Sequence, residues 1–451
     1  MASDPVELTQ KLLTEILDEG ATQAIGVRLW DGTRWPDDRP RRTTLVLNHP
    51  GALRQMLLPG DELSLAEAYL YNDFDIEGEI EAIFPVADRL RERVKETKWK
   101  LRLAKDLLRL PDQKAPRATH RGRARLRGRR HSIERDRQAI AYHYDVSNDF
   151  YALWLDRRMV YSCAYFTSPD DDLDTAQAQK LDYICRKLRL RPGQRLLDIG
   201  CGWGGLVIHA AQHYGVEALG ITLSHNQVEW ANRQIAEAGL ADRCRVELLD
   251  YREVDEEEGF DRLVSVGMFE HVGEEMLEVY FRRAWHLLKP TGLFLNHAIA
   301  RRATDPWPKG STFSNTYVFP DGELISISTT LHVAEMVGFE VRDVESLREH
   351  YAKTLRHWVR RLEAHHDEAL EYVDEPTYRV WRLFMSGSAH GFTVGRHNVY
   401  QALLLKPGPN GESALPLTRA DLYAPGGWPK PDGDGGGGAH RGDPRPVGEE
   451  G

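Results

Sequence analysis

The stretch LLDIGCGWGG, residues 196–205, constrains the fold of this chain more than any other. Its four glycines in ten positions follow the apolar run QRLLDI and precede a helix-type segment at residues 206–214. This order predicts a buried strand, a turn with an almost bare backbone, and a helix. Glycine is expected in such a turn because a Cβ would collide with a ligand pressed onto the backbone, and because positive φ is often required. The stretch therefore predicts a ligand site at the C-terminal end of a strand.

The glycine spacing indicates which ligand binds there. The pattern is Gly200-x-Gly202-x-Gly204 instead of G-x-G-x-x-G, and the turn has no basic residue that could meet a phosphate. S-adenosylmethionine carries a sulfonium, an amino acid and an adenosine but no phosphate, so the shorter pattern, with Asp198 on the preceding strand, favours it over a dinucleotide. A purely structural glycine corner is the alternative.

The next two predicted strands refine this hypothesis. Residues 216–222 end in Thr-Leu-Ser, without the acidic residue that binds ribose hydroxyls in dinucleotide enzymes. Gln227 on the following helix is the nearest substitute. Residues 245–249 run into Asp-Tyr-Arg, where Tyr251 would cover one face of an adenine or would be an ordinary aromatic at a strand end.

Composition divides the chain into segments. At 451 residues and 41% hydrophobic content there is room for two or three domains. We expect an N-terminal accessory α+β domain at residues 1–112, a basic linker at 113–137 and a main domain at 138–425. In the main domain strands and helices alternate, as in an α/β sheet covered on both faces. Residues 426–451, rich in Gly, Pro and charge, are predicted to be a disordered tail.

The cysteines and the N-terminus bear on the compartment. Cys163, Cys185, Cys201 and Cys244 show no CxxC spacing, so we expect a reduced compartment, no disulfides and no metal site. The first residues lack a signal-peptide pattern, and no apolar run approaches the ~20 residues that span a bilayer. A cytoplasmic protein is expected.

Positive charge is concentrated in one segment although the net charge is -10. Residues 113–133, here called the basic strap, contain no acidic residue and no aromatic residue for base stacking, which argues against nucleic acid as a partner. Just before it, residues 94–110 combine Trp99, Leu103, Leu107 and Leu110 with lysines and arginines, the pattern of a basic amphipathic helix. The region is either a solvated linker or a surface that docks on anionic lipid.

Five further stretches together carry a resemblance to a known family. GCGWGGL, GITLSHNQ, VSVGMFEHVG, HLLKPTGLFLNHAI and YHYDVSNDFYALWLDRRMVYSCAYF closely resemble the cyclopropane-fatty-acyl-phospholipid synthase family, including its mycolic-acid relatives. The match runs over residues 138–406 in the expected order. It implies a doubly wound, Rossmann-like class I methyltransferase sheet with helical insertions. The N-terminal segment resembles the extra domain of the longer bacterial synthases.

The resemblance implies a reaction. In this family the π-electrons of a cis double bond in an unsaturated phospholipid acyl chain attack the sulfonium methyl of S-adenosylmethionine and leave a carbocation. Loss of a proton from the new methyl carbon, with bound bicarbonate as the base, then closes a cyclopropane ring. Three alternatives stay open: a methylene- or methyl-branched product on the same scaffold, a methyltransferase for a small polar acceptor, and a lipid-binding protein without turnover.

Site residues follow from the same correspondence. The expected bicarbonate holders are Cys163, Glu270, His297, Ile299 and Tyr351. The expected cofactor contacts are Tyr161, Ser162, Leu196, Asp198, Gly200, Gly202, Gly204, Thr222, Leu223, Gln227, Tyr251 and Arg252. The aromatic pool for stabilising a cation is Tyr161, Tyr165, Phe166, Phe269 and Tyr317. Taken singly, Cys163, His297 and Tyr351 are better explained by ordinary packing, whereas together, in these motifs, they favour the base site. A carboxylate beside bicarbonate requires one shared proton, so Glu270 is expected to orient and polarise the ion.

The implied substrate also bears on partners and location. An acyl chain within a membrane favours the basic strap and residues 94–110 as a docking face for an anionic membrane surface. We therefore expect peripheral association with the inner face of the cell membrane, and a homodimer is possible. Residues 301–330 interrupt the alternation of strands and helices, and we expect them to cover the substrate.

Overall fold

The computed structural model describes residues 4–423, except 94, 118, 120, 121, 145, 146, 306–311 and 414. The chain forms two compact units, Met1–Ala414 and Leu415–Gly451, and the described part of the second contains helix α18 (Ala420–Tyr423). The predicted tail lies outside the described residues, and the boundaries expected near 112 and 138 fall within the first unit and stay a prediction. None of the described helices is both long and apolar enough to cross a membrane.

A seven-stranded sheet forms the centre of the main domain, with strand order β10-β11-β9-β8-β5-β6-β7. The strands are β5 (Arg195–Ile199), β6 (Glu217–Thr222), β7 (Cys244–Leu248), β8 (Phe260–Val266), β9 (Leu288–Arg301), β10 (Glu340–Ser346) and β11 (His397–Leu405). In this sheet β11 runs antiparallel to both of its neighbours, β9 and β10, whereas β5 to β9 pair in parallel. The strand order reverses beside β5, which is where ligands bind in sheets of this type.

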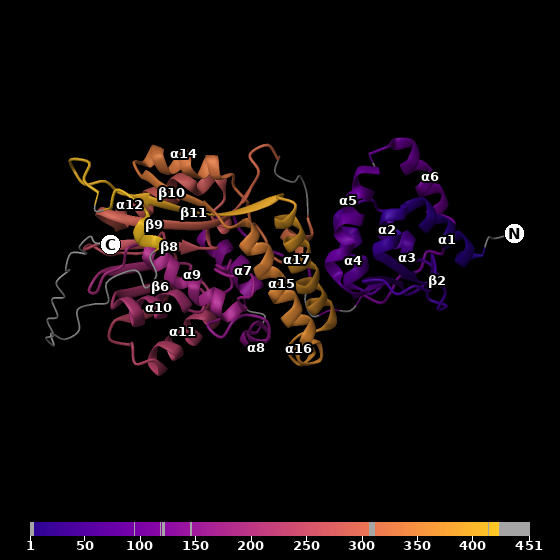
Figure 1. Cartoon of the computed structure of the whole chain (residues 1–451), viewed down its shortest axis with the longest axis horizontal. Helices are drawn as coiled ribbons and strands as arrows, with labels where there is room; N and C mark the ends of the chain where they lie inside the picture. Colours follow the sequence, from indigo (N-terminus) through magenta and orange to yellow (C-terminus); the bar gives the residue numbers. More distant parts are fainter. Residues whose placement is uncertain are drawn as a thin grey trace, which may run out of the picture. The chain divides into compact units, whose positions relative to one another are not determined.

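Helices cover both faces of this sheet, which confirms the doubly wound α/β prediction. Figure 1 shows α9, α10 and α11 on one side and α12 and α14 on the other. Their bounds are α9 (Leu173–Lys187), α10 (Gly205–Tyr214), α11 (His225–Glu237), α12 (Leu277–Leu287) and α14 (Ile327–Val337). Strand β5 is buried along almost its whole length, as expected of a central parallel strand, although Arg195 and Asp198 are charged.

The N-terminal segment has its own four-stranded mixed sheet, with order β2-β1-β3-β4. Its strands are β1 (Ile25–Arg28), β2 (Arg34–Trp35), β3 (Thr43–Leu47) and β4 (Phe74–Gly78). Its helices are α1 (Pro5–Ile16), α2 (Glu19–Ala24), α3 (Ala52–Leu57), α4 (Glu62–Leu70), the 3-10 helix η1 (Ile80–Ile83), α5 (Phe84–Arg93) and α6 (Thr97–Leu107). This is the α+β arrangement expected for the segment.

The amphipathic helix predicted over residues 94–110 is α6, and its apolar stripe packs within the protein. Trp99, Leu103 and Leu107 are all at most 6% exposed and belong to the main hydrophobic core. Leu101 and Leu108, by contrast, are 67% and 57% exposed. The helix therefore uses its predicted apolar face for folding and leaves a smaller, different face to solvent.

The insertions and the C-terminal part of the main domain are helical. They are α7 (Ile133–Tyr144), α8 (Asn148–Ala152), the 3-10 helices η2 (Phe269–His271) and η3 (Glu274–Met276), α13 (Phe313–Tyr317), α15 (Arg348–Ala364), α16 (His366–Tyr372) and α17 (Glu375–Thr393). Helix α13 lies in the segment that we expected to cover the substrate.

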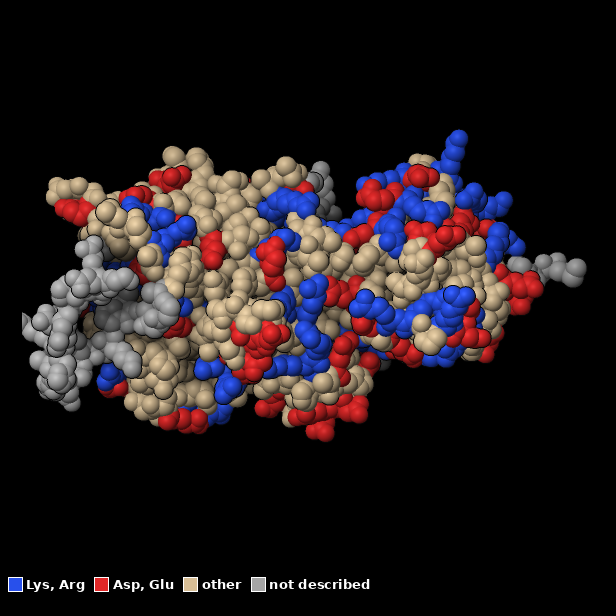
Figure 2. Space-filling view, viewed as in Figure 1, with Lys and Arg blue, Asp and Glu red and all other residues tan. Residues whose placement is uncertain are grey.

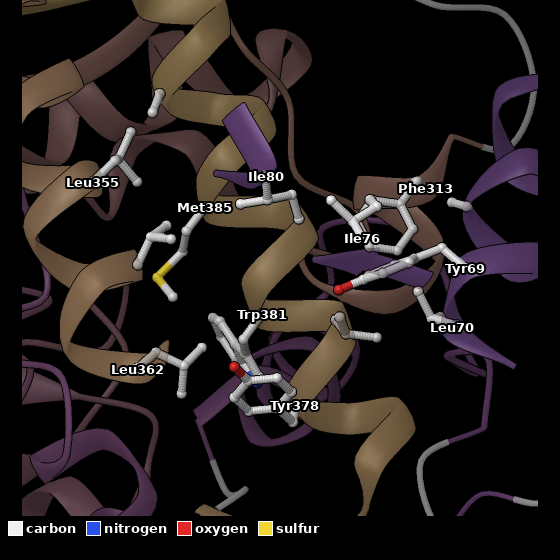
Figure 3. Packing of buried hydrophobic residues seen from close by; sticks show 14 of the residues in the cluster. Tyr69, Leu70, Ile76, Ile80, Phe313, Leu355, Leu362, Tyr378, Trp381 and Met385 are labelled. Atoms are coloured by element: carbon white, nitrogen blue, oxygen red, sulfur yellow. The ribbon is translucent and has the colours of Figure 1, made fainter. Parts of the chain in front are cut away.

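One hydrophobic core joins α17 to elements of the N-terminal segment. Trp381 and Met385 of α17 share a buried cluster with Tyr69, Ile76 and Ile80 (Figure 3). These N-terminal residues come from α4, β4 and η1. The cluster therefore has no boundary between the two parts of the first unit.

Two arginines of α17 add buried polar contacts at the same place. Arg382 donates from Nη1 to the Tyr69 hydroxyl (2.9 Å) and to the Ile76 carbonyl (3.1 Å), and Arg379 donates to the Tyr69 carbonyl (3.0 Å). Because each guanidinium also pairs with a carboxylate, Arg379 with Asp75 and Arg382 with Glu363, burial of these charges is compensated.

Replacing Met385 with Ala tests the importance of this core. Met385 is 0% exposed, and such truncations of a buried side chain cost about 2–5 kcal/mol because they leave a cavity. We expect a loss in this range in urea-induced unfolding followed by fluorescence. The matched control is Met336→Ala, at a position 72% exposed, where the free energy of unfolding should change by less than about 0.5 kcal/mol. Equal effects of the two substitutions would contradict the assignment of the core.

Candidate active site

The glycine turn after β5 requires glycine for two physical reasons. Gly200, Gly202 and Gly204 have φ values of +82°, +55° and +83°, a region that other residues rarely adopt. A Cβ on Gly200 would also lie 2.5 Å from the Cβ of Met268, whereas one on Gly202 would have no protein atom within 4 Å. The predicted positive φ is confirmed, and at Gly200 the close neighbour is a residue of the protein itself.

A pocket opens at the C-terminal ends of β5, β6, β7 and β8, around this turn. It encloses ≈ 1130 Å³, including the part open to solvent. The predicted cofactor residues that line it are Tyr161, Ser162, Asp198, Gly200, Gly202, Thr222, Leu223, Gln227, Tyr251 and Arg252. The other two, Leu196 and Gly204, are not among the lining residues. Leu196 is buried within β5, and Gly204 is the N-cap of α10.

Several lining residues were missed by the sequence reasoning. They include Asp136, Tyr144, Lys180, Met268 and His271. Lys180 lies within the amphipathic helix α9, and Asp136 within the segment interpreted as linker, so nothing in their local patterns distinguishes them from ordinary helix residues.

A buried amine and a buried carboxylate face the pocket near the turn. Lys180 donates a hydrogen bond from Nζ to the Ser162 hydroxyl (2.9 Å), and burial lowers the pKa of this lysine to about 8. Burial raises the pKa of Asp198 to about 7, against the opposing charge of Lys180. Asp198 Oδ1 is buried and has no hydrogen-bond partner among the described residues. A zwitterionic amino acid group, such as the methionine part of the co-substrate, carries the complementary charges.

The end of β6 carries the substitute for the missing acidic residue. Thr222 donates from its hydroxyl to Gln227 Oε1 (2.6 Å), and both residues are buried. The amide nitrogen of Gln227 is a donor that this bond leaves available. An amide here can hydrogen-bond to hydroxyl groups as the usual acid does, but it carries no charge.

Arg252 organises the end of β7. Its Nη2 lies 2.6 Å from Asp250 Oδ2 and 2.8 Å from Asp136 Oδ2, so two carboxylates neutralise one guanidinium. The guanidinium carbon also lies 5.2 Å from the ring centroid of Tyr251. Arg252 therefore fixes Tyr251 and connects α7 to this wall of the pocket.

Glu270, in η2, lies just beyond the C-terminal end of β8. Its Oε1 accepts a hydrogen bond from the backbone N–H of Ile299 (2.7 Å). Its Oε2 is buried without a partner among the described residues, and burial raises the pKa of Glu270 to about 7. The carboxyl group is therefore divided between its two protonation states near neutral pH.

His297, in β9, presents a second unsatisfied polar atom. Gln401 donates from Nε2 to His297 Nδ1 (3.2 Å), which places the ring proton on Nε2 in the neutral tautomer. Burial lowers the pKa of His297 well below its ordinary value, so the ring is neutral. Within the described part of the chain, buried Nε2 has no acceptor.

Cys163 and Tyr351 complete the predicted base site. The Cys163 thiol donates to the Leu347 carbonyl (3.7 Å), which also accepts from the Tyr351 backbone N–H (3.0 Å). Burial raises the pKa of the Cys163 thiol, and burial together with Cys163 and Glu270 raises that of the Tyr351 hydroxyl. Both groups therefore stay neutral.

The predicted base-site residues adjoin the pocket although none of them lines it. Cys163 directly follows Ser162, and Glu270 lies between the lining residues Met268 and His271. The backbone N–H of Gly267, which also lines the pocket, donates to the carbonyl of His297 (2.9 Å). Backbone connectivity thus places this group behind one wall of the pocket.

The structure reduces the number of predicted aromatic residues that can face a ligand in the pocket. Of its members only Tyr161 lines the pocket, where Tyr144 joins it with ring centroids 6.2 Å apart. Phe269 packs against Tyr280 (5.3 Å). Tyr165 and Phe166 stack on His350, and Tyr317 hydrogen-bonds to Glu67. Within the predicted pool, Tyr161 is therefore the residue that faces the pocket, and Tyr144 lies beside it.

Fold and site together define a class of protein. A mostly parallel seven-stranded sheet with strand order β7-β6-β5-β8-β9-β11-β10, and a glycine turn that opens into a pocket suited to a zwitterion and an adenosine, is the arrangement of class I S-adenosylmethionine-dependent methyltransferases. The solved structure of mycolic acid cyclopropane synthase CmaA1 with SAH and CTAB aligns with a TM-score of 0.57 at 36% identity, covering 60% of this chain and 98% of that chain.

Sequence comparison specifies the family. A family described as mycolic acid cyclopropane synthetase matches residues 131–402. "Probable fatty acid methyltransferase" of Pseudomonas putida is 40% identical over 400 residues, 88% of this chain and 95% of the relative. "Cyclopropane mycolic acid synthase 1" of Mycobacterium tuberculosis is 38% identical over 273 residues, 58% of this chain and 94% of the relative. The chain belongs to the mycolic acid cyclopropane synthetase family and is an S-adenosylmethionine-dependent methyltransferase that modifies lipids.

The raised pKa of Glu270 predicts a pH-dependent stability. Because the folded-state pKa exceeds the unfolded value, the carboxyl group lowers stability progressively as pH rises from about 4.5 through about 7. Glu270→Gln removes this titration, so the variant should gain about 2 kcal/mol relative to wild type between about pH 5 and pH 8. Urea unfolding at several pH values measures the difference. Exposed Glu275→Gln serves as the control, and stability curves of Glu270→Gln and wild type that run parallel with pH would contradict the raised pKa.

Proposed function

We propose that this protein transfers a one-carbon unit from S-adenosylmethionine to the cis double bond of an unsaturated phospholipid acyl chain and closes a cyclopropane ring. The observation that carries this proposal is the pair of unsatisfied buried atoms, Glu270 Oε2 and His297 Nε2, beside the co-substrate pocket. A methyltransferase for a polar acceptor needs no such group, because its acceptor supplies its own lone pair. The names of the relatives, which modify fatty or mycolic acids, support the substrate class.

The reaction balances as two steps. The π-electrons of the alkene form a bond to the sulfonium methyl, the S–CH3 bond breaks towards sulfur, and S-adenosylhomocysteine and a secondary carbocation result. Removal of one proton from the new methyl group then frees an electron pair that closes the three-membered ring. Such a cation requires a dry site with aromatic faces and without a free nucleophile.

We propose that a small oxyanion binds behind the pocket wall. His297 Nε2–H is a donor without an acceptor, and the Ile299 N–H and Glu270 form one edge of the same group. Bicarbonate bound here would supply the base that takes the proton. A shared proton between Glu270 and such an anion is reasonable because the pKa of Glu270 is raised to about 7.

The neighbouring side chains protect the cation. Tyr144 and Tyr161 offer ring faces, and both are partly exposed although they pack against the main core cluster. Ile299 and Tyr351 show the same combination of partial exposure and deep packing, which supports a hollow continuous with the base site. The Cys163 thiol stays protonated and hydrogen-bonded to carbonyl groups, so it does not act as a nucleophile.

A second candidate product is a methylene- or methyl-branched acyl chain. The observation that favours it is the name of the Pseudomonas putida relative, a "probable fatty acid methyltransferase", which aligns with 88% of this chain. The same cation gives this product when a proton leaves a different carbon. The two candidates share the pocket, the cation and the need for a base.

Expression in cells rich in monounsaturated phospholipid tests the proposal. Mass spectrometry of the fatty acid methyl esters should show a gain of one CH2, and NMR should show the ring protons that separate a cyclopropane from a branch. Glu270→Gln should lower product formation about 100-fold while S-adenosylmethionine affinity changes little. Glu275→Gln is the matched control, since this residue is exposed. Wild-type protein that leaves the acyl chains unchanged would refute the proposal.

We also propose that the protein docks on an anionic membrane at the cytoplasmic face. Leu101 and Leu108, one face of α6, are exposed together with Lys98 and Lys105, which form no ion pair with described residues. In the basic strap, Arg125, Arg127 and Arg129 are exposed. Elsewhere on the N-terminal elements Figure 2 shows Lys and Arg intermixed with Asp and Glu, so charge is largely balanced there.

Part of the strap, however, is engaged within the protein. Arg117 and Arg123 pair with Glu67 at 3.5 Å and 2.5 Å, and Arg130 pairs with Glu323 at 2.7 Å. These arginines are less available to lipid, and Arg121 lies outside the described residues. The docking proposal therefore depends on the three exposed arginines and on α6.

Co-sedimentation with anionic vesicles tests the docking surface. Substituting Arg125, Arg127 and Arg129 with Gln should weaken binding about 100-fold at low salt, since each cation contributes about 1 kcal/mol near such a membrane. The charge-matched control substitutes exposed Arg233, Arg282 and Arg342. If both triple variants bind alike, these three arginines do not form the docking surface.

A further inference from the structure

Glu67 is a buried carboxylate of the N-terminal segment for which the proposed reaction has no role. It lies in α4, is 4% exposed, and accepts hydrogen bonds from the Tyr317 hydroxyl (2.7 Å) and from Arg123 Nε (2.8 Å). Arg117 Nη1 lies 3.5 Å from its other oxygen. A buried charge with this many partners joins three segments that are far apart in the sequence.

Tyr317 ends α13, the short helix in the expected substrate cover. The Tyr71 hydroxyl lies 3.4 Å from the Tyr317 hydroxyl, and the backbone N–H of Ala124 donates to the Thr316 carbonyl (3.0 Å). Phe313, at the start of α13, belongs to the same buried hydrophobic cluster as Ile76 (Figure 3). Helix α13 therefore contacts both the N-terminal segment and the basic strap. Glu67 accepts hydrogen bonds from Tyr317 of α13 and from Arg123 of the strap.

The two residues after Tyr317 contact residues at or next to the co-substrate pocket. The Val318 carbonyl bonds to His143 Nδ1 (2.8 Å), and Phe319 stacks on the His143 ring with centroids 4.0 Å apart. The Phe319 ring also lies 5.7 Å from that of His271, which lines the pocket. Phe319 therefore forms an aromatic contact between the cover and the co-substrate pocket.

The C-terminal end of residues 313–323 contacts Glu270. The backbone N–H of Glu323 donates to the carbonyl of Glu270 (2.8 Å). Two arginines from α7 and the strap secure this end, Arg135 to Asp321 (2.5 Å) and Arg130 to Glu323 (2.7 Å). Residues 313–323 are thus fixed at one end by Glu67 and at the other by contacts around Glu270.

We propose that Glu67 is a positioning residue for the reaction: by anchoring Tyr317 it holds residues 313–323, and with them Phe319 and Glu270, in the arrangement that keeps water from the carbocation. The inference rests on the proposed function. Glu67 does not touch the reacting atoms and acts through the cover. It gives the N-terminal segment a role in the outcome of the reaction, besides folding.

The chemistry provides a readout specific to this role. A loosened cover admits water to the cation formed by methyl transfer. Water then forms a C–O bond to the cation and releases a proton to solvent, so the acyl chain carries a methyl branch and a neighbouring hydroxyl instead of a ring. A residue that serves stability alone would change the amount of active protein without changing the ratio of hydroxylated to cyclised chains.

Glu67→Gln and Tyr317→Phe test the proposal in purified full-length protein with vesicles of monounsaturated phospholipid. Tyr317→Phe removes only the hydroxyl and leaves the Glu67–arginine pairs intact, so it covers the case in which Glu67→Gln folds poorly. Each variant should lower kcat for ring formation about 10- to 100-fold and raise the hydroxylated fraction at least about 10-fold, with S-adenosylmethionine affinity within about 2-fold of wild type. The matched control is Glu77→Gln, an N-terminal carboxylate that is 53% exposed in its pair with Arg28.

Three results would overturn the inference. Wild-type kcat and product ratio in both variants would show that the anchor is unnecessary. A lowered Tm with an unchanged product ratio at lower temperature would show a purely structural role. Wild-type protein that forms no modified chain would remove the proposed function and this inference with it, whereas active wild type with unaffected variants would remove the inference alone.

Discussion

Parallel pairing of β5 with β6 on one side and β8 on the other is the constraint on which the rest of the structure depends. Leu197 pairs with Leu219 of β6 and with Leu263 of β8, so the C-terminal ends of the three strands lie at one edge. The turn after β5 is fixed there because the N–H groups of Gly200 and Cys201 both donate to the Ile221 carbonyl (2.9 and 3.0 Å). The glycine turn, Gln227 of α11 and Glu270 of η2 all lie on segments that leave this edge.

Burial sets the electrostatics of the site. Lowering the local dielectric disfavours charge, which brings the pKa values of Asp198 and Glu270 to about 7 and that of Lys180 to about 8. The same effect keeps Cys163 protonated and His297 neutral. In the proposed reaction the site holds a sulfonium first and a carbocation afterwards, and groups whose charge adapts to a bound ligand, together with a protonated Cys163, suit both.

The arginines of the basic strap fall into two groups. Arg123 and Arg130 form ion pairs with Glu67 and Glu323. These pairs connect residues 313–323 to the rest of the first unit. Arg125, Arg127 and Arg129 stay exposed, and we propose that they contact a membrane. In our two proposals one basic segment contributes both to lipid docking and to holding residues 313–323, because the same backbone carries both sets of arginines.

Local pattern by itself determined the strand, glycine turn and helix around residues 196–205, the α/β class, and most of the pocket residues contributed by strand ends, because hydrophobic period and glycine placement act over a few residues. It could not find Asp136, Tyr144 or Lys180, which sit in ordinary helical contexts and become lining residues only where α7 and α9 pack against the sheet edge. Nor could it tell that the apolar stripe of α6 faces the core, since an amphipathic pattern is the same whether protein or lipid covers it. Tertiary structure decided these points, because burial, partner and pKa depend on contacts between residues distant in sequence, such as Glu67 and Tyr317.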